Sequence, residues 1–344
     1  MTELATRYMG LELRNPLVAS PSPLSHTVDG ILRLADSGIG SVVLHSLFEE
    51  ELRQQAITDA YLANAGSESF AESLSYFPPS SSVDTGAAHY LSVLERAASA
   101  VDVPLIASLN GVSPGGWTRF ARQMSDAGAS AIELNVHVVQ GDVGASGRGI
   151  EQLHLDVLRS VKDAVDVPVA LKLSPYFSSI GEIALRLDEA GADALVLFNR
   201  PVLPDIDPET LSVFMRTTLS RPLDAGLART WIALLRAQLR CSLAGTTGVE
   251  DTGDVVKYLL AGADVVMTTS ALLRHGPAHA GVILDGLTTW MQRKGFHSVD
   301  RVRGLLVPSA DNLDPQQPAA HDAWERSGYV RAMIEANSRP YGPW

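Results

Sequence analysis

The sequence predicts an α/β protein built as a single closed (β/α)8 TIM barrel, and three observations support this fold class. Short apolar runs alternate with amphipathic stretches along most of the chain, as they do when helices cover parallel strands. Eight such runs are present, and no Gly-x-Gly-x-x-Gly segment follows the first of them, which favours a barrel over a doubly wound open sheet. The length of 344 residues suits one barrel with insertions.

One repeated junction places four of the expected strands. At each copy a helix ends on glycine, and a run rich in β-branched residues or leucine follows at once. This is the pattern expected where a helix C-cap leads into a buried strand. The copies lie at 36–44, 126–134, 189–197 and 260–268.

A second junction, Val-Asp-Val-Pro, places two more strands at 101–108 and 165–172. Its proline opens the strand, where the missing N–H group is tolerated. Segments 16–20 and 241–245 complete the eight. Apolar residues spaced i, i+3, i+4 predict intervening helices at 117–127, 153–164, 180–190, 227–239 and 252–260.

Three insertions interrupt this alternation, at 49–83, 136–149 and 201–223. Each follows an even-numbered strand and therefore extends the face where the carboxyl ends of the strands meet, so we expect a lid or a substrate wall there. We expect one barrel domain over 1–307 and a polar, proline-rich tail over 308–344. A short tail helix around 323–336 is expected to pack on the barrel or on a neighbouring subunit.

The composition limits the possible partners and the compartment. The 39 acidic residues exceed the 27 Lys and Arg, which argues against nucleic acid or an anionic membrane surface as the main partner and favours a small molecule. The single cysteine, Cys241, permits no internal disulfide and no thiolate metal site, as in a reducing compartment. Residues 1–10 lack the apolar stretch of a leader, and no apolar run approaches 18 residues, so we expect a cytoplasmic protein.

Each expected strand ends on small or polar residues, and in a barrel these ends converge on the catalytic face. After the seventh strand, Gly245, Thr246, Thr247 and Gly248 form a loop whose backbone N–H groups are free to bind an anion. Thr269 and Ser270 follow the eighth strand beside it. We expect a phosphate-bearing ligand there, with a plain loop lacking any ligand as the alternative.

Lys172 ends the fifth strand inside an apolar run. A lysine at that depth requires an anionic or strongly polar partner, because burying it unpaired costs several kcal/mol or drives it neutral. It is expected to contact an electron-rich cofactor ring or to form a Schiff base. A structural ion pair with Glu133 is the alternative.

Other polar residues at the strand ends have weaker signals. Asn135 and Asn199 end the fourth and sixth strands, and each amide offers both a donor and an acceptor to a heterocycle. His45 and His137 are candidate proton donors, with a hydrogen-bonded structural role as the alternative. No His, Asp and Glu grouping has metal-ligand spacing, so no metal is expected.

Several motifs together resemble the dihydroorotate dehydrogenase family over residues 3–307, and most closely the branch called dihydroorotate dehydrogenase-like proteins. The family motifs are Asn15-Pro16, 108–111, Glu133-Leu-Asn135, 172–177 and the Gly-Thr-x-Gly-Val loop with its following Leu-x-x-Gly-Ala. The motifs shared with the branch are 8–11, 45–50, 197–200 and 204–207.

The resemblance implies an FMN-dependent oxidoreductase that moves a hydride between a planar, dihydropyrimidine-like ring and the flavin. By position, Lys172 would lie near the pyrimidine edge of the flavin. The other residues that the resemblance assigns to the cofactor are Ser20, Pro21, Ser46, Asn135, Gly245, Thr246, Thr247, Gly248, Thr269 and Ser270. Those that it assigns to the substrate are Asn110, Asn135, Asn199 and Arg200.

This sequence departs from the family pattern at several places, among them His45 where a lysine is expected and segment 73–78, which has no counterpart of the family's Asn-Ser-Met-Gly substrate segment. Val138 stands where the cytosolic members of the family have a cysteine base, which leaves His137, His45 and Lys172 as catalytic candidates. Segment 222–226 replaces a Gly-Gly flavin loop, and Thr247 occupies a glycine position. The alternative functions are a non-redox isomerase or lyase acting on a phosphorylated substrate, and a barrel subunit that has lost catalysis. A homodimer is expected, and the sequence does not identify the electron acceptor.

Overall fold

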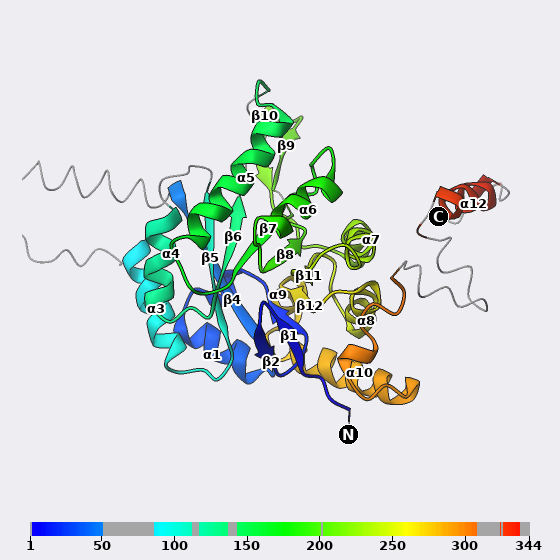
Figure 1. Cartoon of the computed structure of the whole chain (residues 1–344), viewed down its shortest axis with the longest axis horizontal. Helices are drawn as coiled ribbons and strands as arrows, with labels where there is room; N and C mark the ends of the chain where they lie inside the picture. The colour runs from blue at the N-terminus through cyan, green and yellow to red at the C-terminus, as the bar shows by residue number, and fades with distance from the viewer. Residues whose placement is uncertain are drawn as a thin grey trace, which may run out of the picture.

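A computed structural model of the chain describes residues 2–50, 86–111, 117–136, 143–200, 202–307, 324 and 326–337. Eight parallel strands close into a barrel in the order β11-β12-β3-β4-β5-β6-β7-β8 (Figure 1). The (β/α)8 TIM barrel predicted from the sequence is confirmed. The strands are β3 (Leu17–Ala19), β4 (Ser41–Phe48), β5 (Leu105–Gly111), β6 (Ala131–Val136), β7 (Val169–Leu173), β8 (Ala194–Leu197), β11 (Ser242–Gly245) and β12 (Val265–Thr268).

Helices surround the barrel and bury an apolar side against the outer faces of the strands. Because every strand is covered on both sides, the strands are almost entirely apolar rather than alternating. The helices are α1 (Val28–Asp36), α3 (Ala87–Ala98), α4 (Trp117–Asp126), α5 (Gly147–Lys162), α6 (Ile180–Glu189), α7 (Gly226–Leu235), α8 (Thr252–Ala261), α9 (Ser270–His275) and α10 (His279–Lys294).

Two helix boundaries differ from the periodicity-based expectation. Helix α5 begins at Gly147, six residues before the expected start at 153. The Ser146 side chain caps it by accepting a hydrogen bond from Gly149 N–H, so a cap and not an apolar residue sets its start. Helix α7 ends at Leu235, whereas the apolar pattern runs on to 239. The last residues of that pattern form a turn into β11.

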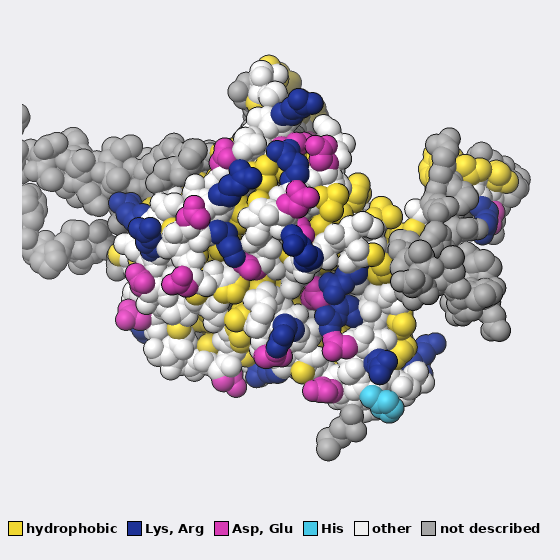
Figure 2. Space-filling model, in the orientation of Figure 1, with side chains coloured by type: hydrophobic (Ala, Val, Ile, Leu, Met, Phe, Trp, Pro, Cys, Tyr) yellow, Lys and Arg dark blue, Asp and Glu magenta, His cyan; other side chains and the backbone are white. Residues whose placement is uncertain are grey.

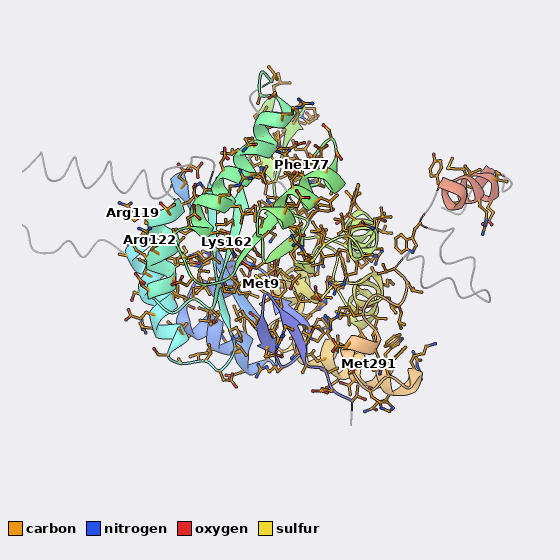
Figure 3. All side chains as sticks on the ribbon, viewed as in Figure 1. Met9, Arg119, Arg122, Lys162, Phe177 and Met291 are labelled. Carbon is orange, nitrogen blue, oxygen red and sulfur yellow. The ribbon has the colours of Figure 1, made fainter. Side chains whose placement is uncertain are left out.

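An N-terminal hairpin closes the end of the barrel where the strands begin. Strands β1 (Thr6–Tyr8) and β2 (Leu11–Leu13) pair antiparallel, and Figure 3 labels Met9 at their turn, in front of the barrel strands. Tyr8 and Met9 are buried against the inward-facing side chains of the strands, including Val18 and Ile106. The interior is therefore a packed core at this end, and chemistry is left to the opposite end.

Part of the 201–223 insertion folds as a second hairpin, β9 (Leu203–Asp207) and β10 (Ser212–Arg216), which projects from the barrel (Figure 1). Short 3-10 helices lie at η1 (Pro23–Ser25), η2 (Pro222–Ala225) and η3 (Val299–Arg301). The tail contains α12 (Arg326–Asn337), close to the expected helix. Within the described residues, no helix is long and apolar enough to cross a membrane.

Candidate active site

A cavity of about 650 Å³ opens at the carboxyl ends of the barrel strands, between them and the β9–β10 hairpin. This volume is typical of small-molecule sites, which span roughly 300–1,000 Å³. The structure brings most of the predicted site residues to its wall. The predicted residues that line it are Ser20, Pro21, Lys172, Asn199, Arg200, Thr246, Thr247, Gly248, Thr269 and Ser270.

Five other predicted residues lie on the strands but outside that wall: Ser46, Asn110, Asn135, Gly245 and His45. Ser46 on β4 pairs its hydroxyl with that of Ser108, with the two oxygens 2.9 Å apart. Asn110, the last residue but one of β5, is in register with Asn135 on β6. Gly245 ends β11 beneath the loop that it introduces. His45 is described below, and His137 lies outside the described residues.

Lys172 points into the barrel and reaches the cavity from β7. Its Nζ lies 3.6 Å from Oε1 of Glu133 and donates to the Ser20 hydroxyl at 3.4 Å. Glu133 is 1% exposed, and neither of its carboxylate oxygens has a hydrogen bond within the described residues. The expected alternative, an ion pair with Glu133, is therefore present, and the same ammonium also faces the cavity.

Two asparagines are joined beside this lysine. Asn199, the second residue after β8, donates from Nδ2 to Oδ1 of the buried Asn135 at 3.1 Å. The Asn199 backbone N–H donates to the Leu173 carbonyl at 2.7 Å, which holds the chain after β8 against the end of β7. The bond fixes the Asn199 amide orientation at the cavity wall, so its carbonyl oxygen is left to accept from a ligand.

The loop after β11 lies close to its own helix layer. A side chain at Gly245 would overlap the Tyr258 ring, so only glycine fits at this close approach. The Tyr258 hydroxyl lies 2.6 Å from the Thr246 carbonyl oxygen and 2.8 Å from that of Thr247, to which it donates. These bonds direct both loop carbonyls toward α8.

Comparisons with known proteins agree with this architecture. The family model described as dihydroorotate dehydrogenase matches residues 3–291. The chain belongs to the dihydroorotate dehydrogenase family. Among its relatives are proteins named dihydroorotate dehydrogenase B (NAD(+)), catalytic subunit. The one from Methanothermobacter thermautotrophicus is 32% identical, covering 88% of this chain and 98% of that protein. Those from Thermoplasma acidophilum and Pyrococcus abyssi are each 26% identical, covering 89% and 88% of this chain and 100% and 99% of the relatives.

Membership in the dihydroorotate dehydrogenase family makes this chain a dihydroorotate dehydrogenase-like oxidoreductase on a TIM barrel.

Thr247, which stands at a glycine position of the family pattern, has an unusual backbone conformation. Thr247 adopts φ +79°, a left-handed conformation that is unfavourable for a β-branched residue. Gly248 follows with φ +69°, and a Cβ there would lie 2.6 Å from the Arg221 carbonyl oxygen. The loop therefore keeps a strained conformation at the cavity, as functional loops often do.

Ser220, a site residue that no sequence motif predicted, lies at the centre of this loop's contacts. Gly248 N–H donates to the Ser220 hydroxyl at 3.1 Å, and Ser220 N–H donates to the Ser270 hydroxyl at 3.0 Å. The two hydroxyl oxygens are 2.9 Å apart. Ser220 belongs to a polar insertion with no motif around it, so no local signal could have found it.

Two acidic residues beside the cavity are held by arginines. In η2, which replaces the family's Gly-Gly loop, Asp224 accepts from Arg221 N–H at 2.8 Å and lies 3.8 Å from the Arg200 guanidinium. On the hairpin, Asp205 pairs with Arg216 at 3.0 Å. Arg200 and Arg216 line the cavity, so their positive charges offset these carboxylates at its mouth.

His45 is directed into the helix layer. Its Nδ1 lies 3.3 Å from the Ser25 carbonyl oxygen, and its ring packs against His26 and Tyr90 with centroids 3.9 and 4.9 Å away. Burial, with His26 and His89 nearby, lowers the pKa of His45 to about 4. The imidazole is therefore neutral at physiological pH.

The single cysteine lies far from the cavity along the barrel axis. Cys241 precedes β11 and is buried, where Asp188 accepts from its backbone N–H at 2.8 Å. Burial raises the pKa of its thiol, with Asp188 adding to the effect. In the described part of the chain, no group of three or more His, Cys, Asp and Glu residues is arranged to hold a metal ion.

Proposed function

We propose that this protein is an FMN-dependent oxidoreductase that transfers a hydride between a dihydropyrimidine-like ring and the flavin. The observation that carries the proposal is the Lys172 ammonium, paired with buried Glu133 and facing a cavity whose other wall is the loop 246–248. A buried cation at one place and an anion-binding loop at another match the two polar ends of a flavin mononucleotide. The cavity volume of about 650 Å³ is compatible with a ligand of that size.

The residues present fit the cofactor in both parts. Thr246, Thr247, Gly248, Thr269 and Ser270 would hold the phosphate, with Gly245 setting the loop. Ser20, Pro21, Ser46, Asn135 and Lys172 would hold the ring system. When bound, FMN supplies a ring that accepts or returns a hydride.

Substrate positioning falls to the polar strand ends. We assign Asn110, Asn135, Asn199 and Arg200 to the substrate. The Asn135–Asn199 hydrogen bond orients both amides before a ligand enters, which reduces the cost of ordering them. Lys172 would stabilise negative charge on a bound ring, and its pairing with Glu133 keeps that ammonium in place.

The proton that leaves with the hydride requires a base, and the family's cysteine is replaced by Val138. Cys241 cannot take over, because it lies buried at the opposite end of the barrel strands. We therefore propose a base other than cysteine, with His137, His45 and Lys172 as candidates. His45 is neutral and able to accept a proton, but its ring packs against η1 and α3, away from the wall of the cavity.

A flavin titration tests the proposal. We expect purified protein to show the visible absorbance of oxidised flavin, or to acquire it when incubated with FMN. At 100 times the dissociation constant, bound FMN should raise the free energy of unfolding by about 2.7 kcal/mol, which a thermal melt detects. Protein that shows neither flavin absorbance nor a thermal shift would contradict the proposal and favour a non-redox barrel enzyme or a barrel without catalysis.

The assembly and electron acceptor form part of the same proposal. Relatives are named catalytic subunits of NAD(+)-dependent enzymes, so we extend to this chain a protein partner that passes electrons onward. We also propose a homodimeric core in the cytoplasm. Light scattering of the purified protein tests the dimer, because a monomer at micromolar concentration would contradict it. Anaerobic reoxidation of reduced protein by NAD(+), with and without host extract, tests the partner.

A further inference from the structure

Four donor groups from three residues converge where the loop after β11 meets the cavity: the hydroxyl and N–H of Ser220, the hydroxyl of Ser270 and the N–H of Gly248. All three residues line the cavity. Ser220 comes from the segment between β10 and η2, Gly248 from the loop after β11, and Ser270 from the start of α9. Three separate parts of the chain are thus joined at one point by hydrogen bonds of 2.9–3.1 Å.

This group has one more donor than it can use. The Ser220 hydroxyl accepts from Gly248 N–H, and the Ser270 hydroxyl accepts from Ser220 N–H. One of the two hydroxyl protons forms the bond between the two oxygens. The other hydroxyl proton has no acceptor among the described residues, so the group can donate to an anion oxygen in the cavity without losing an existing bond.

Arg274 holds Ser220 at this point from behind. Its Nη2 donates to the Ser220 carbonyl oxygen at 2.7 Å, and its Nη1 is paired with the Glu250 carboxylate. The other Glu250 oxygen lies 2.7 Å from His275 Nε2. Glu250 is therefore neutralised by Arg274 and oriented by His275, and its charge does not oppose an anion at the neighbouring hydroxyls.

We propose that Ser220 is a direct ligand of the cofactor phosphate and that Arg274 is its positioning residue, an inference that rests on the proposed flavin function. In the segment after Ser220, Pro222 has no N–H group, and the Asp224 N–H is bonded to the Arg221 carbonyl oxygen at 2.9 Å. Arg221 N–H is bonded to the Asp224 carboxylate. A side-chain hydroxyl anchored by Arg274 replaces those backbone donors.

Binding of two flavins separates this role from a general structural one. FMN and riboflavin share the ring system, but only FMN has the phosphate. Full-length protein freed of flavin is titrated with each, following the quenching of flavin fluorescence. We expect Ser220→Ala to raise the Kd for FMN by about 10- to 100-fold, the loss expected for a hydrogen bond to a charged group. The Kd for riboflavin should change by less than about threefold. Ser99→Ala, an exposed serine after α3, is the matched control.

Arg274→Gln tests the positioning role. If Arg274 acts through Ser220, the variant should raise the Kd for FMN and leave the Kd for riboflavin almost unchanged, as Ser220→Ala does. The double variant should then bind FMN about as weakly as Ser220→Ala alone, because the two losses are coupled and not additive. Circular dichroism of each variant verifies folding, and competition by inorganic phosphate reports on the phosphate end independently of the ring.

The outcomes separate this inference from the proposed function. If the wild-type protein binds neither flavin, the proposed function and this inference both fail. If it binds both flavins but Ser220→Ala leaves the ratio of their Kd values unchanged, the flavin function stands and the role of Ser220 is refuted. If the losses of FMN affinity in the double variant are additive, the positioning role of Arg274 is refuted, while Ser220 stands as a ligand.

Discussion

At the residue scale, the Lys172–Glu133 pair shows how a charge is kept inside an apolar barrel. Strands β6 and β7 are adjacent, and Glu133 pairs in register with Ala170, two residues before Lys172. The ammonium contacts both the carboxylate and the Ser20 hydroxyl. The carboxylate has no other cation partner in the described part of the chain. Removing one member of a buried pair leaves an uncompensated charge, which is far more costly than removing both.

We therefore predict strong coupling between the two residues. Lys172→Met alone should lower the free energy of unfolding by about 3 kcal/mol, because it leaves Glu133 unpaired at 1% exposure. Adding Glu133→Gln should recover most of that loss. Urea unfolding of the two single variants and the double variant measures the coupling energy. Additive losses would show that the pair is solvated and not energetically joined.

His45 gives a prediction for pH. Its pKa is about 4 in the folded protein and about 6.5 when unfolded, so the unfolded chain binds the extra proton first as pH falls. Stability contributed by neutral His45 is thus present above pH 6.5 and lost as pH falls toward 4. Burial also lowers the pKa of His154, so its protonation likewise destabilises the fold as pH falls.

Comparison of His45→Gln with wild type isolates this residue from His154. Between pH 6.5 and 4, the free energy of unfolding should fall less in the variant than in wild type. The difference should be about 1–2 kcal/mol after allowance for solvent screening. Urea midpoints measured across that pH range give the difference. Parallel curves for the two proteins would mean that His45 protonates as easily in the folded state as in the unfolded state.

At the scale of elements, the loop after β11 depends on helix α8. Tyr258 on α8 supports two successive loop carbonyls through one hydroxyl, and its ring fills the space where Gly245 has no side chain. The left-handed Thr247 is held between this support and the Phe198 carbonyl, to which its hydroxyl donates at 3.2 Å. The strained loop conformation is thus maintained by contacts from other elements.

Tyr258→Phe should loosen this loop without emptying the core. We expect the free energy of unfolding to fall by about 1–3 kcal/mol, because the carbonyls of Thr246 and Thr247 lose a buried hydrogen-bond donor while the aromatic ring is kept. Hydrogen exchange should speed up at 246–249 and stay unchanged in β5 and β6. Tyr90→Phe serves as the control, since its hydroxyl accepts from Ser108 N–H on β5 at 2.9 Å. Equal exchange effects at 246–249 in both variants would contradict the assignment.

At the scale of the whole molecule, the barrel of 1–307 and the tail of 308–344 remain a proposed division. The tail meets the barrel at Trp324, whose Nε1 donates to the Leu306 carbonyl oxygen at 3.0 Å. Figure 2 shows apolar side chains along one side of α12. On α12, the side chains of Tyr329, Met333 and Ile334 are 44–64% exposed. A helix with such a side is stable in water mainly when another surface covers it.

We predict that α12 packs on its own barrel or on a neighbouring subunit. Replacing Met333 and Ile334 with serine should lower the melting temperature if the helix packs on its own barrel. It should dissociate an oligomer, seen by light scattering, if the helix packs on a neighbour. Val282→Ser on α10, with its side chain 64% exposed, is the matched control. No change in either measurement relative to this control would show that the helix packs on neither surface.

The sequence by itself determined the positions of the eight barrel strands, most of the helices, the glycine-bounded loop at 245–248 and the inward lysine. These follow from local causes: apolar period, glycine at helix ends, proline at strand starts and small residues in a turn. Only the tertiary structure decided that Ser220 meets Gly248 and Ser270, that His45 points toward His26 and Tyr90, and that Glu133 lies beneath Lys172. These contacts join residues far apart in the chain. The strand register and closure of the barrel set them, and no local pattern encodes that geometry.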